Sequence, residues 1–343
     1  MKRWQIGLLG TLVSILAIYF IVRQIDVKAL ATALAQARYI YLIPAILLLI
    51  GGLFTRAIRW RVLLSSELPL NRAFSIINVS YLANSVLPLR MGEVVRAYLA
   101  TRADPPIPVL KSASTIIVER LLDLLALVVL LGIALAGGVL PPELRAAAAF
   151  TLPVMIAGFL VLVFLSSQRA LAHRILAWVM GRLPLKLSVQ SLTQWLDHFL
   201  DGLAPLTQPR ALFLALFWTA VSWGFSIATG YIVMLAFYPQ ASWIATCLFI
   251  AAASLVIAIP AVPGSIGPYE LSILLALSAV GYGEPRDTAT AFALVVHGLN
   301  LGLYAVMGII GFIQEGISLG QLSRGVQEMR QQRTVTQDVV STD

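Results

Sequence analysis

Charged and amide side chains interrupt segments that are otherwise strongly apolar. The first group of them is Asn84, Arg90, Glu93 and Arg96. An ionisable side chain at membrane depth costs about 2.5 to 3.5 kcal/mol on insertion scales, so by default it marks a transport pathway or a paired structural site. Guanidinium groups bind phosphate through parallel hydrogen bonds, while Glu93 stands one helical turn from Arg96 and can pair with it. A site for a polar headgroup and a purely structural Glu–Arg pair are both open interpretations.

A second group, Glu119, Arg120 and Asp123, lies inside another apolar segment. Glu119 and Asp123 share a helix face, and Arg120 can neutralise Asp123. Two carboxylates on one face invite a proton, a cation or an arginine from another helix. The alternative is an interhelical lock to the first group, because buried charges are usually paired. A third group, Tyr269 and Glu270, follows a run of Gly and Pro that is too short for a phosphate-binding loop and lacks its lysine.

Together these groups form the candidate substrate site. We expect the arginines to hold a phosphate and the carboxylates to hold a cationic moiety or to tune the arginines. The candidate residues are Asn84, Arg90, Glu93, Arg96, Glu119, Arg120, Asp123, Tyr269 and Glu270. His297, near Asn300 in the last apolar segment, is expected to be a helix-packing hydrogen bonder, with a proton carrier or ligand as the alternative. The sequence has no nucleophile elbow and no Cys–His spacing for a metal, so we expect neither an enzyme nor a cofactor.

The composition explains why these charges stand out. Of 343 residues, 59% are hydrophobic and only 12% are charged, against roughly 25% charged residues in a soluble domain. The mean hydropathy is +0.89, which excludes a water-soluble enzyme. The net charge of +8 comes from Lys and Arg between the apolar blocks, where they set orientation and meet anionic headgroups, so we expect no nucleic acid as a partner. The single cysteine, Cys247, excludes a disulfide framework.

The apolar blocks predict an all-α polytopic membrane protein with six spanning helices and two re-entrant helical hairpins. A helix needs about 20 apolar residues to cross the hydrocarbon core. The blocks near that length are residues 6–22, 39–54, 112–135, 147–165, 211–237 and 288–312. Two others, residues 73–108 and 243–281, are broken by Pro, Gly and charge. Irregular backbone at membrane depth is tolerated only where protein or a wet cavity satisfies it, so we expect each to enter and leave on one side.

The order of these segments repeats, which predicts an inverted-repeat architecture. Each half reads span, span, hairpin, span, and three crossings are an odd number, so the second half must insert upside down. At the two breaks, Pro88 and Pro263 are each followed four residues later by glycine and then by a carboxylate. We expect a single membrane domain and a polar cytoplasmic tail, with bounds of 1–317 for the domain, about 1–140 and 141–317 for the repeats, and 318–343 for the tail.

The distribution of Lys and Arg predicts the orientation of the chain. We leave out Arg90, Arg96 and Arg120 as lying at membrane depth and place the N-terminus in the cytoplasm. Sixteen basic residues, Arg56 and Arg59 among them, then fall in cytoplasmic segments and five in external loops. This asymmetry is the one that the positive-inside rule expects. Both termini should face the cytoplasm in a multi-pass protein of the cell membrane.

Residues 169–206 differ from the apolar blocks, because apolar residues recur there at three- and four-residue spacing between polar ones. This pattern predicts amphipathic helices at the cytoplasmic interface. The alternative is a plain helical linker with its apolar side on the bundle. Several tryptophans near the span ends, Trp60 and Trp243 among them, are expected to be interfacial anchors.

Three signatures carry a family resemblance: NSVLPLRMGEVVR from Asn84, ERLLD from Glu119 and PGSIGPYE from Pro263. Their order and spacing resemble the membrane region of the lysylphosphatidylglycerol synthase family, which also occurs alone in small flippase-like membrane proteins. The resemblance implies a lipid translocase-like domain. In the full synthases a soluble aminoacyl-transferase domain follows, whereas this chain ends at Asp343 after a short tail, so we do not expect the synthase chemistry. Relatives fused to glycosyltransferases imply a polyprenyl-linked sugar as another cargo.

We therefore expect an integral membrane lipid translocase that moves a phospholipid or polyprenyl-linked headgroup across the membrane, with membrane lipids as partners. Such a protein should hold a polar cavity reachable from both leaflets. A non-transporting scaffold or accessory subunit for a lipid-modifying enzyme or glycosyltransferase is the alternative, and it predicts a closed interior. A third interpretation is an intramembrane transferase acting on a polyprenyl phosphate, which predicts a one-sided cavity.

Overall fold

The computed structural model describes residues 18–19, 26–87, 90–136, 167–180, 189–258 and 263–316, with scattered residues between 153 and 164. All regular elements within these residues are helices, which confirms the all-α prediction for this part of the chain. The predicted spans at 6–22 and 147–165 lie largely outside the described residues, and the tail at 318–343 lies wholly outside them.

Three of the described helices are long and apolar enough to cross a bilayer. They are α3 (Leu42–Leu63), preceded by the short turn η1 (Tyr39–Tyr41), α10 (Pro209–Phe237) and α13 (Arg286–Glu315). The 28 residues of α6 (Val109–Ala136) give it a length of about 42 Å, but it contains the charged group Glu119, Arg120 and Asp123. Long helices thus coincide with four of the six predicted spans. The six-span topology stays a prediction.

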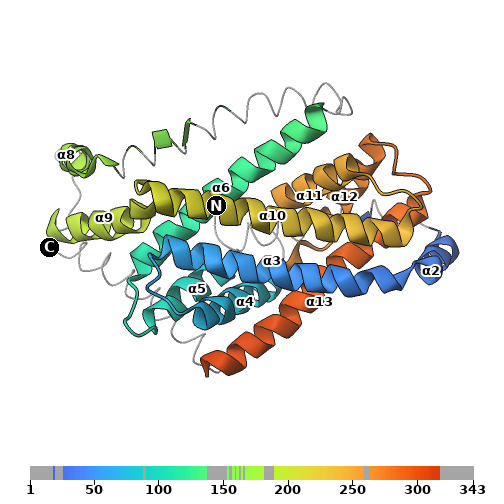
Figure 1. Cartoon of the computed structure of the whole chain (residues 1–343), viewed down its shortest axis with the longest axis horizontal. Coiled ribbons are helices and arrows are strands. Elements are labelled where there is room, and N and C mark those ends of the chain that lie inside the picture. Colours follow the sequence, from blue (N-terminus) through green and yellow to red (C-terminus); the bar gives the residue numbers. More distant parts are fainter. Residues whose placement is uncertain are drawn as a thin grey trace.

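Two pairs of shorter helices occupy the two broken segments. The first pair is α4 (Leu70–Val86) and α5 (Met91–Thr101), and the second is α11 (Trp243–Ala258) and α12 (Pro268–Ala279). The members of each pair pack against each other (Figure 1). The longest of these helices, α4, has 17 residues, which corresponds to about 25 Å, less than the ~30 Å of a hydrocarbon core. Their entry into a bilayer from one side stays a prediction.

Each packing contact between the main helices of one half has a counterpart in the other. The central pair is α3 against α10, which run antiparallel: Thr55 contacts Ser222 and Arg59 contacts Thr219. The α4 helix packs along α13, and in the same manner α11 packs along α6. Glycine allows the close approach of α13 to α4, because a Cβ at Gly308 would overlap the Leu82 side chain.

Two apolar cores support these pairs, one in each half. In the first half, Trp60, Ile76 and Leu99 of α3, α4 and α5 are fully buried together. In the second half, Phe249 and Phe292 of α11 and α13 pack edge to face, with ring centroids 5.2 Å apart. Because such cores anchor both helix pairs, the described residues that flank the two breaks are held in defined positions.

The segment between the halves contains α8 (Arg169–Met180) and α9 (Val189–Leu203). Apolar residues of α9, Leu200 and Leu203 among them, pack on Val118 and Leu122 of α6. The apolar side of α9 therefore faces the bundle, as the linker interpretation describes, and an interfacial position stays a prediction. A further short helix, α2 (Val27–Gln36), precedes α3 and packs on α13.

Candidate functional site

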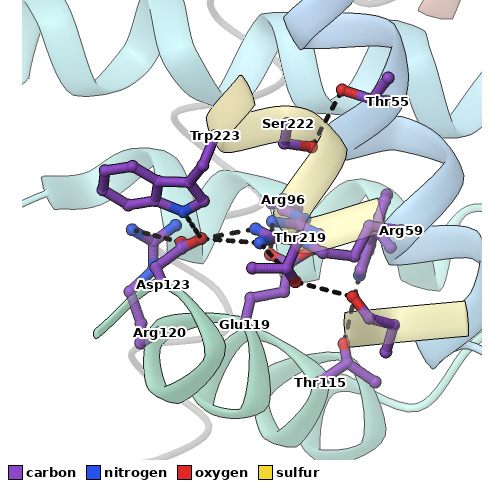
Figure 2. A network of polar contacts seen from close by, with 12 residues as sticks. Thr55, Arg59, Arg96, Thr115, Glu119, Arg120, Asp123, Thr219, Ser222 and Trp223 are labelled. Atoms are coloured by element: carbon purple, nitrogen blue, oxygen red, sulfur yellow. Dashed lines mark hydrogen bonds and ion pairs between the residues drawn. The ribbon is translucent and has the colours of Figure 1, made fainter. Parts of the chain in front are cut away.

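A network of buried ion pairs connects α3, α5 and α6 (Figure 2). Arg96 of α5 donates to both carboxylate oxygens of Glu119 on α6, at 2.6 and 2.9 Å. Arg59 of α3 lies 3.8 Å from Glu119 and 2.7 Å from Asp123, one turn further along α6. Arg59, Arg96 and Glu119 are only 2%, 5% and 1% exposed. The two carboxylates on one face of α6 thus bind arginines from other helices, one of the outcomes expected from the sequence.

The network continues toward the first hairpin through partly exposed residues. Asp123 lies 3.6 Å from Arg120 and accepts a hydrogen bond from the indole N–H of Trp223 on α10, at 3.3 Å. Arg120 lies 3.6 Å from Oε1 of Glu93, and the same oxygen lies 3.2 Å from Arg90. Glu93 therefore bridges two arginines.

Two sequence predictions in this region are wrong. Glu93 and Arg96 do not pair, because Arg96 points to Glu119 on the neighbouring helix. Trp60 is no interfacial anchor: it is fully buried, its indole N–H donates to Thr115 at 3.1 Å, and the Arg96 guanidinium lies 3.9 Å from its ring centroid. The cation–π contact and the two hydrogen bonds together fix the plane of the Arg96 guanidinium.

The break of the first hairpin is held by an asparagine. The backbone N–H of Gly92 donates to Oδ1 of Asn84 at 2.8 Å, which joins the end of α4 to the start of α5. A Cβ at Gly92 would overlap the carbonyl oxygen of Ser80, so only glycine fits at this crossing. Arg90, the N-cap of α5, has left-handed backbone angles of φ 53° and ψ 42°. Glu93 lies in the first turn of α5, where the helix dipole favours a negative charge.

The break of the second hairpin is held by a carboxylate and a histidine. Glu270, in the first turn of α12, accepts the backbone N–H of Gly267 on Oε2 at 2.7 Å. Its Oε1 lies 2.6 Å from Nδ1 of His297 on α13. The Tyr269 ring stacks on the His297 ring, with centroids 4.2 Å apart. Glu270 and His297 are each 5% exposed, so their contact is a buried hydrogen bond between α12 and α13.

The two breaks meet, and a cavity of about 440 Å³ lies beside the meeting point. Gly264, in the short turn η4 (Pro263–Ser265), lies against the backbone oxygen of Ser85 at the end of α4. Side chains of both halves form the cavity wall. Its polar members include Arg56, Ser80, Tyr81, Asn84, Arg90, Glu93, Arg96, Arg120, Asp123, Trp223, Ser226, Tyr269, His297, Asn300 and Tyr304.

Most of the residues proposed from the sequence line this one cavity. Seven of the nine do so: Asn84, Arg90, Glu93, Arg96, Arg120, Asp123 and Tyr269. Glu119 and Glu270 stand one layer behind the wall, where they bind Arg96 and His297. Both carboxylates are engaged by protein groups, so their direct contribution is to position these two neighbours.

Sequence reasoning missed two arginines of α3. Arg56 lines the cavity and Arg59 belongs to the buried network, whereas both were assigned to the cytoplasm. The helix continues to Leu63 with no breaker before Ser65, and that continuity is the signal that places both arginines inside the helix. Removing them from the charge count leaves fourteen cytoplasmic basic residues against five external ones. The predicted orientation keeps its basis, although nothing in the structure tests it.

The cavity wall carries an excess of positive charge. It contains four arginines (Arg56, Arg90, Arg96 and Arg120) and two carboxylates (Glu93 and Asp123), which give a net charge of +2. Arg59 and Glu119 behind the wall cancel each other. Arg56 donates to Ser226 at 3.2 Å and lies over the Tyr81 ring, and it forms no ion pair within the described part of the chain. Among those same residues, no group of His, Cys, Asp and Glu could hold a metal ion.

Comparisons with known proteins agree on a membrane family. Residues 7–308 match the family described as "Lysylphosphatidylglycerol synthase TM region". The "UPF0104 membrane protein" of Methanothermobacter thermautotrophicus is 26% identical over 306 residues, which cover 87% of this chain and 90% of that protein. The "Glycosyltransferase AglD" of Haloferax volcanii is 25% identical over 90% of this chain, and the match spans about half (54%) of that protein's length. No solved structure matches the chain.

Proposed function

Because the chain belongs to the lysylphosphatidylglycerol synthase transmembrane-region family, we propose that it is a membrane lipid translocase whose cavity binds a phosphate-bearing lipid headgroup. The observation that carries this proposal is the surplus of arginine in the cavity wall. A charge held away from water costs several kcal/mol unless it is paired. Arg56 has no carboxylate partner in the described residues, so an anion in the cavity would supply the missing charge.

The chemistry of the wall favours a phosphate over a carboxylate or a halide. Guanidinium groups present planar, forked donors that match phosphate oxygens, and four of them converge here from α3, α5 and α6. A cavity of about 440 Å³ lies within the usual range for small-molecule sites. The remaining wall includes Leu124, Leu127, Ile250 and Leu301, which suit the first methylene groups of an acyl or polyprenyl chain.

The position of the cavity supports movement of the headgroup as well as binding. In transporters built from inverted repeats, broken helices of the two halves meet near the bilayer midplane and form the substrate site. Here the hairpin tips of the two halves meet beside the cavity, and both halves contribute to its wall. The proposal assigns no chemical transformation and no cofactor to the chain.

One observation favours a second candidate function. The relative from Haloferax volcanii is named a glycosyltransferase and extends well beyond the matched region. A membrane domain of this type could therefore present a polyprenyl-linked substrate to a glycosyltransferase or another lipid-modifying enzyme without moving it across the membrane. The same cavity would bind the same phosphate in that case.

Leaflet exchange and binding, measured on the same variants, test the two candidates. Purified protein is reconstituted into phosphatidylcholine vesicles that contain fluorescent phosphatidylglycerol or a fluorescent polyprenyl phosphate, and dithionite reports the outer leaflet. We expect exchange by the wild type and at least a tenfold loss for Arg56→Gln and Arg90→Gln. Arg169→Gln is the matched control, since Arg169 pairs with Asp201 on the surface, 2.8 Å away. Binding without exchange would favour the presenting role, and wild-type behaviour of Arg56→Gln would remove the arginine site.

A further inference from the structure

The Glu270–His297 pair gives the cavity a group that can gain or lose a proton. Gly267 N–H is an obligate donor, so Oε2 of Glu270 accepts. One proton therefore lies between Oε1 and Nδ1, 2.6 Å apart, whichever atom carries it. A further proton taken up by the pair changes the state of the second ring nitrogen, Nε2. The pair thus has a net charge of −1 with one proton and 0 with two.

The histidine of this pair is accessible from the cavity. His297 and Tyr269 belong to the second half of the chain. They line the same cavity wall as the arginines of the first half. Nε2 of His297 has no hydrogen-bond partner among the residues that the structure describes. Water in the cavity can therefore deliver a proton to Nε2, and the only bond that forms is N–H.

The charge of the pair is coupled to the occupancy of the cavity. With the cavity wall at +2, the pair at −1 brings the whole site to +1, and protonation brings it to +2. An empty cavity therefore favours the singly protonated pair, because the arginines repel a further proton. A bound phosphate neutralises the arginines and removes that repulsion, so anion and proton must favour each other's binding.

We propose that Glu270 and His297 form a proton-binding site that takes up a proton when an anionic headgroup enters the cavity. The inference rests on the proposed function, because it needs an anion on the arginines. It gives the translocase a route by which a proton gradient could drive a lipid anion. The proton would be released when the headgroup leaves and the arginines again repel it.

Other ionisable groups share the cavity wall with His297. The tyrosines of the wall are Tyr81, Tyr269 and Tyr304. Its charged residues are Arg56 on α3, Arg90 at the start of α5, Glu93 and Arg96 on α5, and Arg120 and Asp123 on α6. The wall residues of α10 and α11 are Trp223, Ser226, Ile250, Ser254 and Ile257, none of which is charged. The helix α2, which also packs on α13, has one charged residue, Lys28, and it does not line the cavity. Ordinary carboxyl, tyrosine and arginine groups titrate near about 4, 10 and above 12, whereas histidine titrates near about 6.5.

Calorimetric titration in two buffers of different ionisation enthalpy measures the protons taken up. The probe is dihexanoyl phosphatidylglycerol, a phosphodiester that does not titrate between pH 6 and 8, added to the full chain in detergent. We expect a net uptake of protons on probe binding by the wild type. His297→Gln should take up no proton when the probe binds, because Gln still donates to Glu270 and does not titrate, and its affinity for the probe should fall because the favourable coupling is lost.

His198→Gln is the matched control, since His198 is an exposed histidine of α9, and it should retain the wild-type uptake. Probe binding without proton uptake by the wild type at pH 6, 7 and 8 would overturn this inference and leave the proposed function standing. Equal uptake by His297→Gln and wild type would also overturn it. Failure of the wild type to bind any anionic probe would remove both proposals. If His297→Gln does not fold, the wild-type measurement decides.

Discussion

Replacing Glu119 with glutamine should destabilise the protein far more than an equivalent change at the surface. Glu119 is 1% exposed and holds Arg96 by two hydrogen bonds, while Arg59 stands 3.8 Å away. The amide keeps the shape of the side chain and one oxygen acceptor, so it removes the charge without opening a cavity. Arg96 then has no carboxylate within the buried network.

The magnitude follows from which partners remain. Removing one member of a buried ion pair typically costs about 3 to 5 kcal/mol, because the other charge is left buried. Arg59 keeps Asp123 at 2.7 Å, and Arg96 keeps one hydrogen bond and the Trp60 ring. The expected loss is therefore at the lower end, about 3 kcal/mol. With an unfolding entropy of about 2.1 cal/mol/K per residue, 1 kcal/mol corresponds to about 1.4 °C for a chain of 343 residues, so the melting temperature should fall by roughly 4 °C.

The assay is thermal unfolding of detergent-solubilised protein, followed by circular dichroism. The matched control is Asp201→Asn, which breaks the exposed pair with Arg169 and should cost at most about 1 kcal/mol. The double variant Arg96→Gln/Glu119→Gln should recover part of the loss, because it leaves neither of these two charges without the other. A melting temperature for Glu119→Gln equal to that of the control would refute the view that this network locks α3, α5 and α6.

Two further perturbations test the helix packing and the topology. Gly308→Ala should cost about 1 to 3 kcal/mol in the same assay, because the added Cβ would overlap α4. Gly302 has open space around it, so Gly302→Ala should be neutral or stabilising by up to about 1 kcal/mol. Equal effects at both positions would contradict close packing of α4 on α13. In a Cys247→Ala background, a cysteine that replaces the exposed Gly281 should react with a thiol reagent added outside the cell. A cysteine that replaces Thr101 should react only from the cytoplasm. External labelling at position 101 would mean that the first hairpin crosses the membrane.

The sequence located the hairpin breaks because their causes are local. Proline cannot continue a helix and glycine permits close backbone approach, so the two similar patterns fall where α4, α5, α11 and α12 begin and end. Charged residues inside apolar segments were equally visible, because their burial is costly whatever the fold. These two signals identified seven of the residues that line the cavity.

The sequence offered an interhelical lock between the first two groups as one alternative, but which arginine binds which carboxylate could not be predicted, because it depends on neighbouring helices. The spacing of Glu93 and Arg96 allows a local pair worth only about 0.2 to 0.5 kcal/mol, and the buried, two-point contact of Arg96 with Glu119 prevails over it. Arg56 and Arg59 were misplaced because hydropathy marks where apolar residues end, whereas a helix can continue past that point.

The shared packing plan of the two halves contrasts with their unequal charges, and this contrast bears on the resting state of the protein. A carrier built from inverted repeats changes its open side when its halves exchange conformations. Identical halves would make the inward- and outward-open forms equal in free energy. Here the arginine network lies in the first half and the Glu270–His297 pair in the second, so the two forms of such a carrier would differ in free energy. Each 1.4 kcal/mol of difference shifts their ratio about tenfold. A translocase of this kind would wait for its cargo on one preferred side of the membrane, while the gradients of lipid and proton would set the direction of net flow.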